Sequence, residues 1–231
     1  MKALWLCCLL IPGVALADIV GATSRNMNFE FKLGPFKPLI DRESTLTGTP
    51  YETTFGGGPL LLGEFELERQ FFQKVGTLGA GLSIGYGEKF GHAVNAVTGE
   101  ITEESTGLHL IPMKALLVYR FDYLAQTYSV PLVPYVKGAF IVCPWWITKG
   151  ADIEVVDGVR GQSVNYGVAF TGGLALQLDF LDPRLARDFD TSAGVNHTYL
   201  FAEWSLQELN LGGGKIDLSS RHWMFGLSFE F

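Results

Sequence analysis

Cysteine is scarce in this chain, and its positions exclude most cysteine chemistry. Among the 231 residues there are three cysteines, Cys7, Cys8 and Cys143. The first two lie in an apolar N-terminal segment that we predict to be removed, so Cys143 alone is expected in the mature chain. A single cysteine makes neither an internal disulfide nor a cysteine metal cluster. The mature protein must therefore be stabilised by other interactions.

Positive charge and long apolar runs are also lacking. The chain has 17 Lys and Arg residues against 24 Asp and Glu residues, a net charge of −7. Because nucleic-acid phosphates select basic surfaces, we expect no nucleic-acid partner. Hydrophobic residues make up 48% of the chain, yet there is no run of about 18 apolar residues that would span a membrane as a helix. The apolar residues must be arranged in a shorter pattern.

The N-terminus has the features of an export signal. Lys2 precedes the apolar stretch ALWLCCLLIPGVALA, and Ala15-Leu16-Ala17 fits the small-x-small cleavage rule. A membrane anchor is the alternative, but the stretch is too short and its flanks suit cleavage. We therefore predict a cleaved signal peptide at residues 1–17 and one domain at residues 18–231.

Apolar residues recur at every second position in the mature chain. The final stretch, HWMFGLSFEF, alternates large apolar residues with small or polar ones up to Phe231. A period of two is the pattern of a β-strand with one apolar face. The alternating segments cover residues 27–33, 60–72, 78–87, 109–121, 133–147, 164–180, 197–209 and 222–231. The sequence therefore predicts an all-β protein with eight strands.

The second face of these segments favours a membrane barrel over a soluble β-sandwich. It carries glycine, small residues and isolated charges, as the interior of a narrow barrel requires, whereas the apolar face suits lipid. Several segments are also longer than the usual strand of five or six residues, and aromatic residues gather at segment ends, as in membrane-interface girdles. The predicted fold is an eight-stranded antiparallel transmembrane β-barrel with short periplasmic turns and longer outer loops.

Closure of the sheet follows from the membrane environment. In hydrocarbon every backbone N–H and C=O must be paired within the protein, so the last strand must pair with the first. The connections expected at one end are residues 34–59, 88–106, 148–162 and 210–220, and those at the other end are 73–77, 121–132 and 181–196. The last of these is long, and we expect a short helix in it.

The end of the chain resembles the C-terminal signal of bacterial outer-membrane β-barrels, a terminal aromatic residue preceded by apolar residues at alternate positions. The matching residues are Trp223, Phe225, Leu227, Phe229 and Phe231. In that group the barrel-assembly machinery recognises the signal. The resemblance thus implies this machinery and periplasmic chaperones as partners during biogenesis.

Three further stretches resemble a family of outer-membrane β-barrel proteins found in myxobacteria. They are LGPFKPLID, FGGGPLLLGEFELE and IPMKALLVYRFDYLAQTYSVPLVPYVKGAF. The resemblance implies the barrel fold and a location in the bacterial outer membrane, in contact with membrane lipid and lipopolysaccharide. It implies no established activity, and we expect a monomer.

Charged residues on the second face form the best candidate site. We expect a network in the lumen made by Glu30, Lys32, Glu64, Glu66, Glu68, Lys114, Arg120, Lys137, Glu203 and Glu230. Buried charges are retained only when they are paired or hydrated. Because eight strands leave an interior that side chains just fill, we favour a structural plug. A gated pore that prefers cations is the alternative.

We find no catalytic or cofactor site in the sequence. The four histidines, His92, His109, His197 and His222, fall on different segments without a metal-binding spacing. His197 and Ser205 share a strand but lie roughly 26 Å apart, too far to react together. A catalytic pair assembled from different strands stays open. We therefore expect a structural or surface-interaction barrel that is no enzyme, with a small passive pore and a membrane-embedded lipid hydrolase as alternatives.

Overall fold

The computed structural model describes residues 26–43, 46, 48–94, 101–128, 130–156, 158–211 and 216–231. The predicted signal peptide, residues 1–17, lies outside the described residues. No helix in the described part of the chain is long and apolar enough to cross a membrane.

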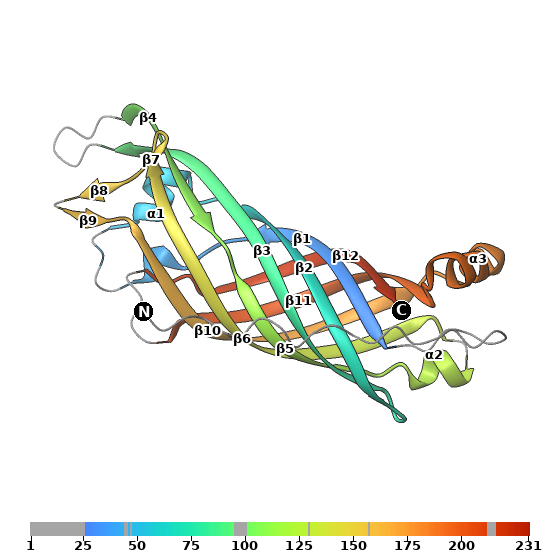
Figure 1. Cartoon of the computed structure of the whole chain (residues 1–231). Helices are drawn as coiled ribbons and strands as arrows, with labels where there is room; N and C mark the ends of the chain where they lie inside the picture. Colours follow the sequence, from blue (N-terminus) through green and yellow to red (C-terminus); the bar gives the residue numbers. More distant parts are fainter. Residues whose placement is uncertain are drawn as a thin grey trace, which may run out of the picture.

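Long antiparallel strands form one sheet that closes on itself (Figure 1). In chain order they are β1 (Met27–Phe36), β2 (Leu60–Gln73), β3 (Thr77–Val94), β4 (Ile101–Leu110), β5 (Met113–Arg120), β6 (Leu132–Lys149), β10 (Gln162–Gln177), β11 (His197–Leu211) and β12 (Ser220–Glu230). Neighbours in sequence pair along the ring, and β12 pairs with β1 to close it. The expected pairing of the last strand with the first is confirmed.

The C-terminal residue takes part in this closure. The backbone N–H of Phe231 donates to the carbonyl of Met27 at 2.8 Å, and the N–H of Met27 donates to the carbonyl of Phe231 at 2.9 Å. The ladder between β1 and β12 therefore continues to the last residue of the chain. This explains how a chain can end on an ordered aromatic residue.

Strands β4 and β5 together occupy one position of the ring. Both pair with β3 on one side and with β6 on the other. The break between them falls at Ile111 and Pro112, because a proline has no N–H to donate to a ladder. The surrounding backbone adapts, with the N–H of Gly85 donating to the Pro112 carbonyl at 2.8 Å. The ring thus has eight strand positions, one for each predicted segment.

The connections differ in part from the expectation. Figure 1 shows α2 (Tyr123–Tyr128), α3 (Pro183–Ala193) and the C-terminus at one end of the barrel, which we call the terminal end. The opposite end, called the loop end, carries η1 (Ile40–Arg42), α1 (Pro50–Phe55), β7 (Asp152–Ile153), β8 (Val155–Val156) and β9 (Val159–Arg160). The expected loop at 88–106 is wrong, since β3 continues to Val94 and β4 begins at Ile101.

The connections at the terminal end are short only in part, and the expectation of one long connection is confirmed. Only the connection at 74–76 is short, whereas the one at 178–196 contains the expected helix, α3. Asp182 caps this helix by accepting from the N–H groups of Arg184 and Leu185, and Gly194 ends it with φ 71°. Strong local helix signals thus override the tendency toward tight turns at this end.

Side chains alternate between the two faces of the wall. Apolar residues such as Phe65 (51% exposed) and Leu82 (60%) cover the outside. Inside, one apolar cluster fills the loop end and includes Phe36, Leu62 and Trp145, and a smaller cluster around Tyr135, Tyr199 and Phe201 fills the terminal end. The charged residues intermingle with the second cluster, where Tyr135 and Tyr199 donate hydrogen bonds to Glu203 and Glu230.

Candidate functional site

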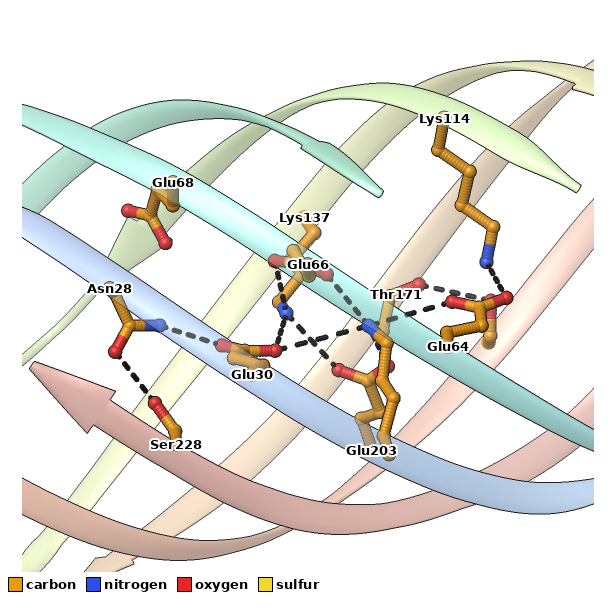
Figure 2. Close-up of polar contacts among 12 residues, drawn as sticks. Asn28, Glu30, Glu64, Glu66, Glu68, Lys114, Lys137, Thr171, Glu203 and Ser228 are labelled. Atoms are coloured by element: carbon orange, nitrogen blue, oxygen red, sulfur yellow. Dashed lines mark hydrogen bonds and ion pairs between the residues drawn. The ribbon is translucent and has the colours of Figure 1, made fainter. Parts of the chain in front are cut away.

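Lys137 is the hub of the charged interior. Its ammonium group donates to Glu30 at 2.5 Å and to Glu66 at 2.7 Å, and it lies 3.4 Å from Glu203 (Figure 2). The side chain is 4% exposed and its three acids are 1–2% exposed. One lysine on β6 therefore joins acids from β1, β2 and β11 across the lumen.

Lys32 duplicates two of these contacts from another wall of the barrel. Its ammonium group lies 2.7 Å from Glu66 and 2.8 Å from Glu203. Glu66 and Glu203 each contact two cations, which offsets the large cost of burying a carboxylate. The two lysines and their acids thus form one continuous network.

Two further bases extend the network along the barrel axis. Arg120 donates through Nη2 to Glu30 at 2.7 Å and through Nη1 to Glu68. Lys114 donates to Glu64 at 2.6 Å, and this acid also lies 3.8 Å from Lys32. The network therefore joins Glu68 nearer the terminal end to Lys114 nearer the loop end.

Strand register explains why the bases are needed. Glu30 on β1 lies directly opposite Glu66 on β2, and Lys32 lies opposite Glu64. Like charges directly opposite one another destabilise a sheet. Lys137 removes the conflict by binding both Glu30 and Glu66 from across the lumen. The acids of β1 and β2 are thus compatible only in the closed barrel.

Glu230 lies inside the barrel like the rest of the predicted set, but its hydrogen bonds come from neutral groups. Gln70 donates to it at 2.8 Å and Tyr199 at 3.2 Å. Neutral donors also reach Glu30, from Asn28 at 3.1 Å, and Glu203, from Tyr135 at 3.0 Å. Sequence reading missed these polar residues. Their position on the same inward face was the signal that could have found them.

An inward glycine makes room for one of the acids. A Cβ atom at Gly79 would lie 2.0 Å from Glu68 Oε1. The wall of β3 must therefore lack a side chain at this point for the Glu68 carboxylate to lie flat against it. Small residues and charges alternate inside the barrel because the lumen is narrow.

Three of the acids meet closely enough to hold a metal ion. Carboxylate oxygens of Glu30, Glu66 and Glu68 lie within 4.8 Å of one another. Arg120 and Lys137 already bind these carboxylates. The cationic side chains thus supply the positive charge that a metal would otherwise bring.

The predicted assembly residues lie on the outer face of β12 and at its end. Trp223 and Phe225 are more than half exposed, and Phe231 is 38% exposed. Their partners across the sheet include Phe29, which pairs with Phe229, and Trp204, which pairs with Trp223. They form part of the apolar outer surface and have no contact with the charged interior.

The histidines lie on four different strands, as expected. His222 is buried inside the barrel, where its ring meets Phe36 with centroids 5.1 Å apart. His197 contacts Asp179 at the terminal end. Burial alone would raise the pKa of the Asp179 carboxyl, but hydrogen bonds from His197, Gln177 and the Thr198 N–H lower it below its ordinary value.

These features define a closed eight-position β-barrel with an apolar outer face and an ion-paired interior. Among solved structures it is similar to Neisserial surface protein A, with a TM-score of 0.44 and 10% identity over 92% of this chain and 100% of that one. It is also similar to the N-terminal barrel domain of Pseudomonas aeruginosa OprF, with a TM-score of 0.43 and 12% identity over 90% of this chain and 98% of that one.

A third similar structure is the outer membrane enzyme PagL, with a TM-score of 0.42 and 13% identity over 87% of this chain and 97% of that one. All three TM-scores are below 0.5. No protein-family model and no curated protein sequence matches the chain. Membership of the myxobacterial family therefore stays a prediction.

Proposed function

We propose that this chain is an integral β-barrel of the bacterial outer membrane with a structural or surface-interaction role and a lumen closed by its own side chains. The observation that carries the proposal is the inverted polarity of the closed ring. Its outer face is apolar and exposed, whereas its interior holds ion pairs whose members are almost fully buried. Such a surface is stable in lipid and would aggregate in water.

Closure of the sheet supports the membrane location. A lipid environment tolerates a sheet only when no strand edge is left unpaired. The pairing of β1 with β12 removes both edges. Membrane lipid and lipopolysaccharide would then surround the barrel, and the exposed aromatic residues of β12 would serve the barrel-assembly machinery and chaperones before insertion.

The packed interior favours a plug over the alternative of a small passive pore. At the loop end the lumen is filled by residues that are at most 3% exposed, including Tyr51, Leu62, Leu108 and Trp145. Tyr51 belongs to α1, and its hydroxyl donates to the Gly58 carbonyl at 2.8 Å. Burial, followed by the nearby Asp41 carboxylate, raises the pKa of Tyr51 to about 12, so the group stays neutral. An ion would have to displace this apolar cluster and then the network below it.

A surface-interaction role is favoured by the shape of the loop end. Strands β3 and β6 have 18 residues each, compared with 10 in β1. The paired strands β8 and β9 carry Val155 and Val159 at 57% and 56% exposure. Exposed apolar side chains on a hairpin tip are suited to contact another molecule.

Electrophoresis of the purified protein tests the membrane barrel directly. We expect unboiled and boiled samples in detergent to migrate differently, because a closed ring has no edge strand at which unfolding can start. The protein should also sediment with outer membranes after alkaline washing. Recovery as a soluble periplasmic protein with identical mobility before and after boiling would refute the proposal.

A further inference from the structure

The outer face of the barrel carries a hydrogen-bonded cluster near the loop end. Its members come from three adjacent strands: Tyr86 and Glu88 from β3, His109 from β4 and Thr148 from β6. Register brings them together, since Glu88 pairs with His109, and Gly107, two residues before His109, pairs with Thr148. The residues are far apart in sequence, so no spacing rule reveals the cluster.

Donor and acceptor counting orients the protons in this cluster. The Tyr86 hydroxyl donates to Glu88 Oε2 at 2.7 Å and lies 3.0 Å from His109 Nδ1. A hydroxyl has only one proton to donate, so its oxygen must accept from Nδ1–H. In the neutral ring Nε2 is then unprotonated and able to act as a base. It lies 3.4 Å from Thr148 Oγ1, so in this tautomer the Thr148 hydroxyl is the donor of the pair.

The contacts therefore run from the Thr148 hydroxyl to the His109 imidazole, and from there through the Tyr86 hydroxyl to the Glu88 carboxylate. This is the arrangement in which a base activates a hydroxyl nucleophile while a third group orients the base. Glu88 Oε2 lies 3.6 Å from His109 Nδ1 and favours the positive ring that forms when Nε2 takes a proton. Contacts of this length commonly shorten when a substrate binds.

Aromatic neighbours hold the imidazole in place. The His109 ring stacks on Trp146 with centroids 5.2 Å apart and planes 11° apart, and it meets the Phe90 ring edge-on at 5.6 Å. Its side chain is 11% exposed. A Cβ atom at Gly107 would lie 2.7 Å from Thr148 Oγ1 and 2.8 Å from His109 Nε2. The absence of a side chain at Gly107 therefore permits the contact between hydroxyl and base.

An apolar groove on the outer surface borders the cluster on the side of Tyr86 and Glu88. It has a volume of about 660 Å³, and its walls include Leu61, Phe65 and Ile84. Tyr86, Glu88 and Phe90 line the groove as well, and Glu88 is the residue that pairs with His109 on the next strand. This volume is within the usual range for sites that bind small molecules. An acyl chain lying in the groove would place its polar end at Tyr86 and Glu88, next to the strand that carries His109.

We infer that this cluster hydrolyses carboxylic esters of lipid acyl chains, with Thr148 as the nucleophile and His109 as the general base. This activity goes beyond the structural role proposed above and depends on the membrane location only for the choice of a lipid substrate. Tyr86 and Glu88 are positioning residues. Gly107 has no side chain that would block the contact between Thr148 and His109.

The reaction balances without a cofactor. Thr148 Oγ1 attacks the ester carbonyl carbon, and its proton passes to His109 Nε2. The carbon–oxygen bond to the alcohol then breaks, and His109 returns the proton to the leaving oxygen, which leaves an acyl ester on Thr148. Water attacks this ester, gives a proton to His109, and releases the fatty acid while Thr148 regains its proton. The net reaction converts ester and water to acid and alcohol.

The wild-type barrel is tested first, refolded in detergent and shown to be closed by its gel mobility. The probes are para-nitrophenyl palmitate in mixed micelles and an alkyl fluorophosphonate, whose phosphorus should bond to Thr148 Oγ1 with loss of fluoride. We expect release of para-nitrophenol and a labelled peptide that contains Thr148. A closed barrel that neither hydrolyses the ester nor takes the label overturns the inference and leaves the structural proposal intact.

Variants then separate chemistry from packing. Thr148→Val and His109→Gln should each lower the hydrolysis rate by at least about 100-fold, whereas Thr148→Ser keeps the hydroxyl and should retain a tenth of the rate or more. His92→Gln is the matched control because His92 is an exposed histidine on β3 outside the cluster, and it should leave the rate unchanged. Equal loss in Thr148→Ser and Thr148→Val would assign Thr148 to packing and overturn the inference.

Steady-state kinetics test the positioning role of Glu88. Glu88→Gln removes the carboxylate that lies 3.6 Å from His109 Nδ1, so kcat should fall by about tenfold while KM stays unchanged. Glu88→Asp keeps the charge and should recover part of the lost rate. A variant that changes KM alone would contradict the arrangement of carboxylate and base.

Discussion

Arg120 illustrates how a single side chain stabilises the interior of the barrel. Its guanidinium group binds Glu30 and Glu68 at the same time, and Glu30 has a second cation in Lys137. Glu68 has Arg120 as its one ion-pair partner among the described residues. Breaking a buried ion pair from one side leaves an uncompensated charge, at a cost of about 3–5 kcal/mol. The loss of stability when a base is removed therefore depends on whether each acid that it binds still contacts a second cation.

Arg120→Met should lower the free energy of unfolding by about 3–5 kcal/mol, because Glu68 loses its cation. Lys114→Met should cost less, since Glu64 keeps Lys32 at 3.8 Å. Reversible urea unfolding from detergent or vesicles measures both. Arg120→Lys is the matched control: it keeps the charge but loses the forked contact to two acids, so its stability should fall between wild type and Arg120→Met. Equal losses of stability in Arg120→Met and Lys114→Met would contradict the idea that Glu64 keeps a second cation and Glu68 does not.

Asp179 confers a dependence of stability on pH at the terminal end. Its pKa is lowered in the folded protein, despite burial, by hydrogen bonds from His197, Gln177 and the Thr198 N–H. A lowered folded pKa means that the stabilisation is complete above the unfolded value of about 3.9 and is lost as pH falls through the folded value. Asp179→Asn should thus be less stable than wild type near pH 6, and the difference should shrink below about pH 4. A difference that stays constant with pH would contradict this.

At the scale of the element, β12 combines a structural role with a proposed assembly role. Its last residue pairs with the start of β1 through the backbone, while its outward aromatic residues lie on the surface. The backbone pairs are made only after the ring closes. The outward side chains, in contrast, are readable in the unfolded chain. The two roles therefore act at different times and can be separated.

Deletion of Phe231 should impair biogenesis more than stability. Burying a Phe contributes only about 1.5–3 kcal/mol, and this one is 38% exposed. We expect the variant to be depleted from outer membranes and degraded in the periplasm, yet to refold in detergent into a heat-modifiable barrel close to wild type. Phe140→Ala is the control, since Phe140 is also outward and half exposed but lies on β6. Normal membrane levels of the deletion variant would refute the signal hypothesis.

At the scale of the whole molecule, two layers of buried side chains fill the interior of the barrel. The apolar cluster lies at the loop end, and the charged network lies below it. Part of the apolar cluster comes from α1, but most comes from the strands themselves. The strands that close the ring therefore also supply most of the side chains that fill its interior.

Planar bilayers with reconstituted protein should show no steady single-channel conductance. A variant with residues 49–56 replaced by a short glycine linker, which removes α1, should also stay closed because the charged network is intact. Both proteins must first show the mobility shift of a closed barrel. Steady conductance in the wild type would favour the pore, and conductance in the variant alone would assign the seal to α1.

The sequence by itself determined which side chains face which way. Alternation is a local property of the strand, since successive Cβ atoms point to opposite faces, and so the strands, the apolar exterior and the inward charges were all predictable. Helix α3 was predictable too, because its caps are local. The lengths of β3 and β4 and the break at Pro112 were harder, because a strand ends where its partners stop pairing.

Only the tertiary structure decided which residues meet. Lys137 reaches Glu30 across 107 positions of sequence, and His109 meets Glu88 and Thr148 from neighbouring strands. The register of a strand and the closure of the ring depend on all strands together. A shift of one strand by one residue moves all of its inward side chains to the outer face. The choice of partners across a lumen therefore follows from the closed ring, where hydrogen bonding fixes every strand against two neighbours at once.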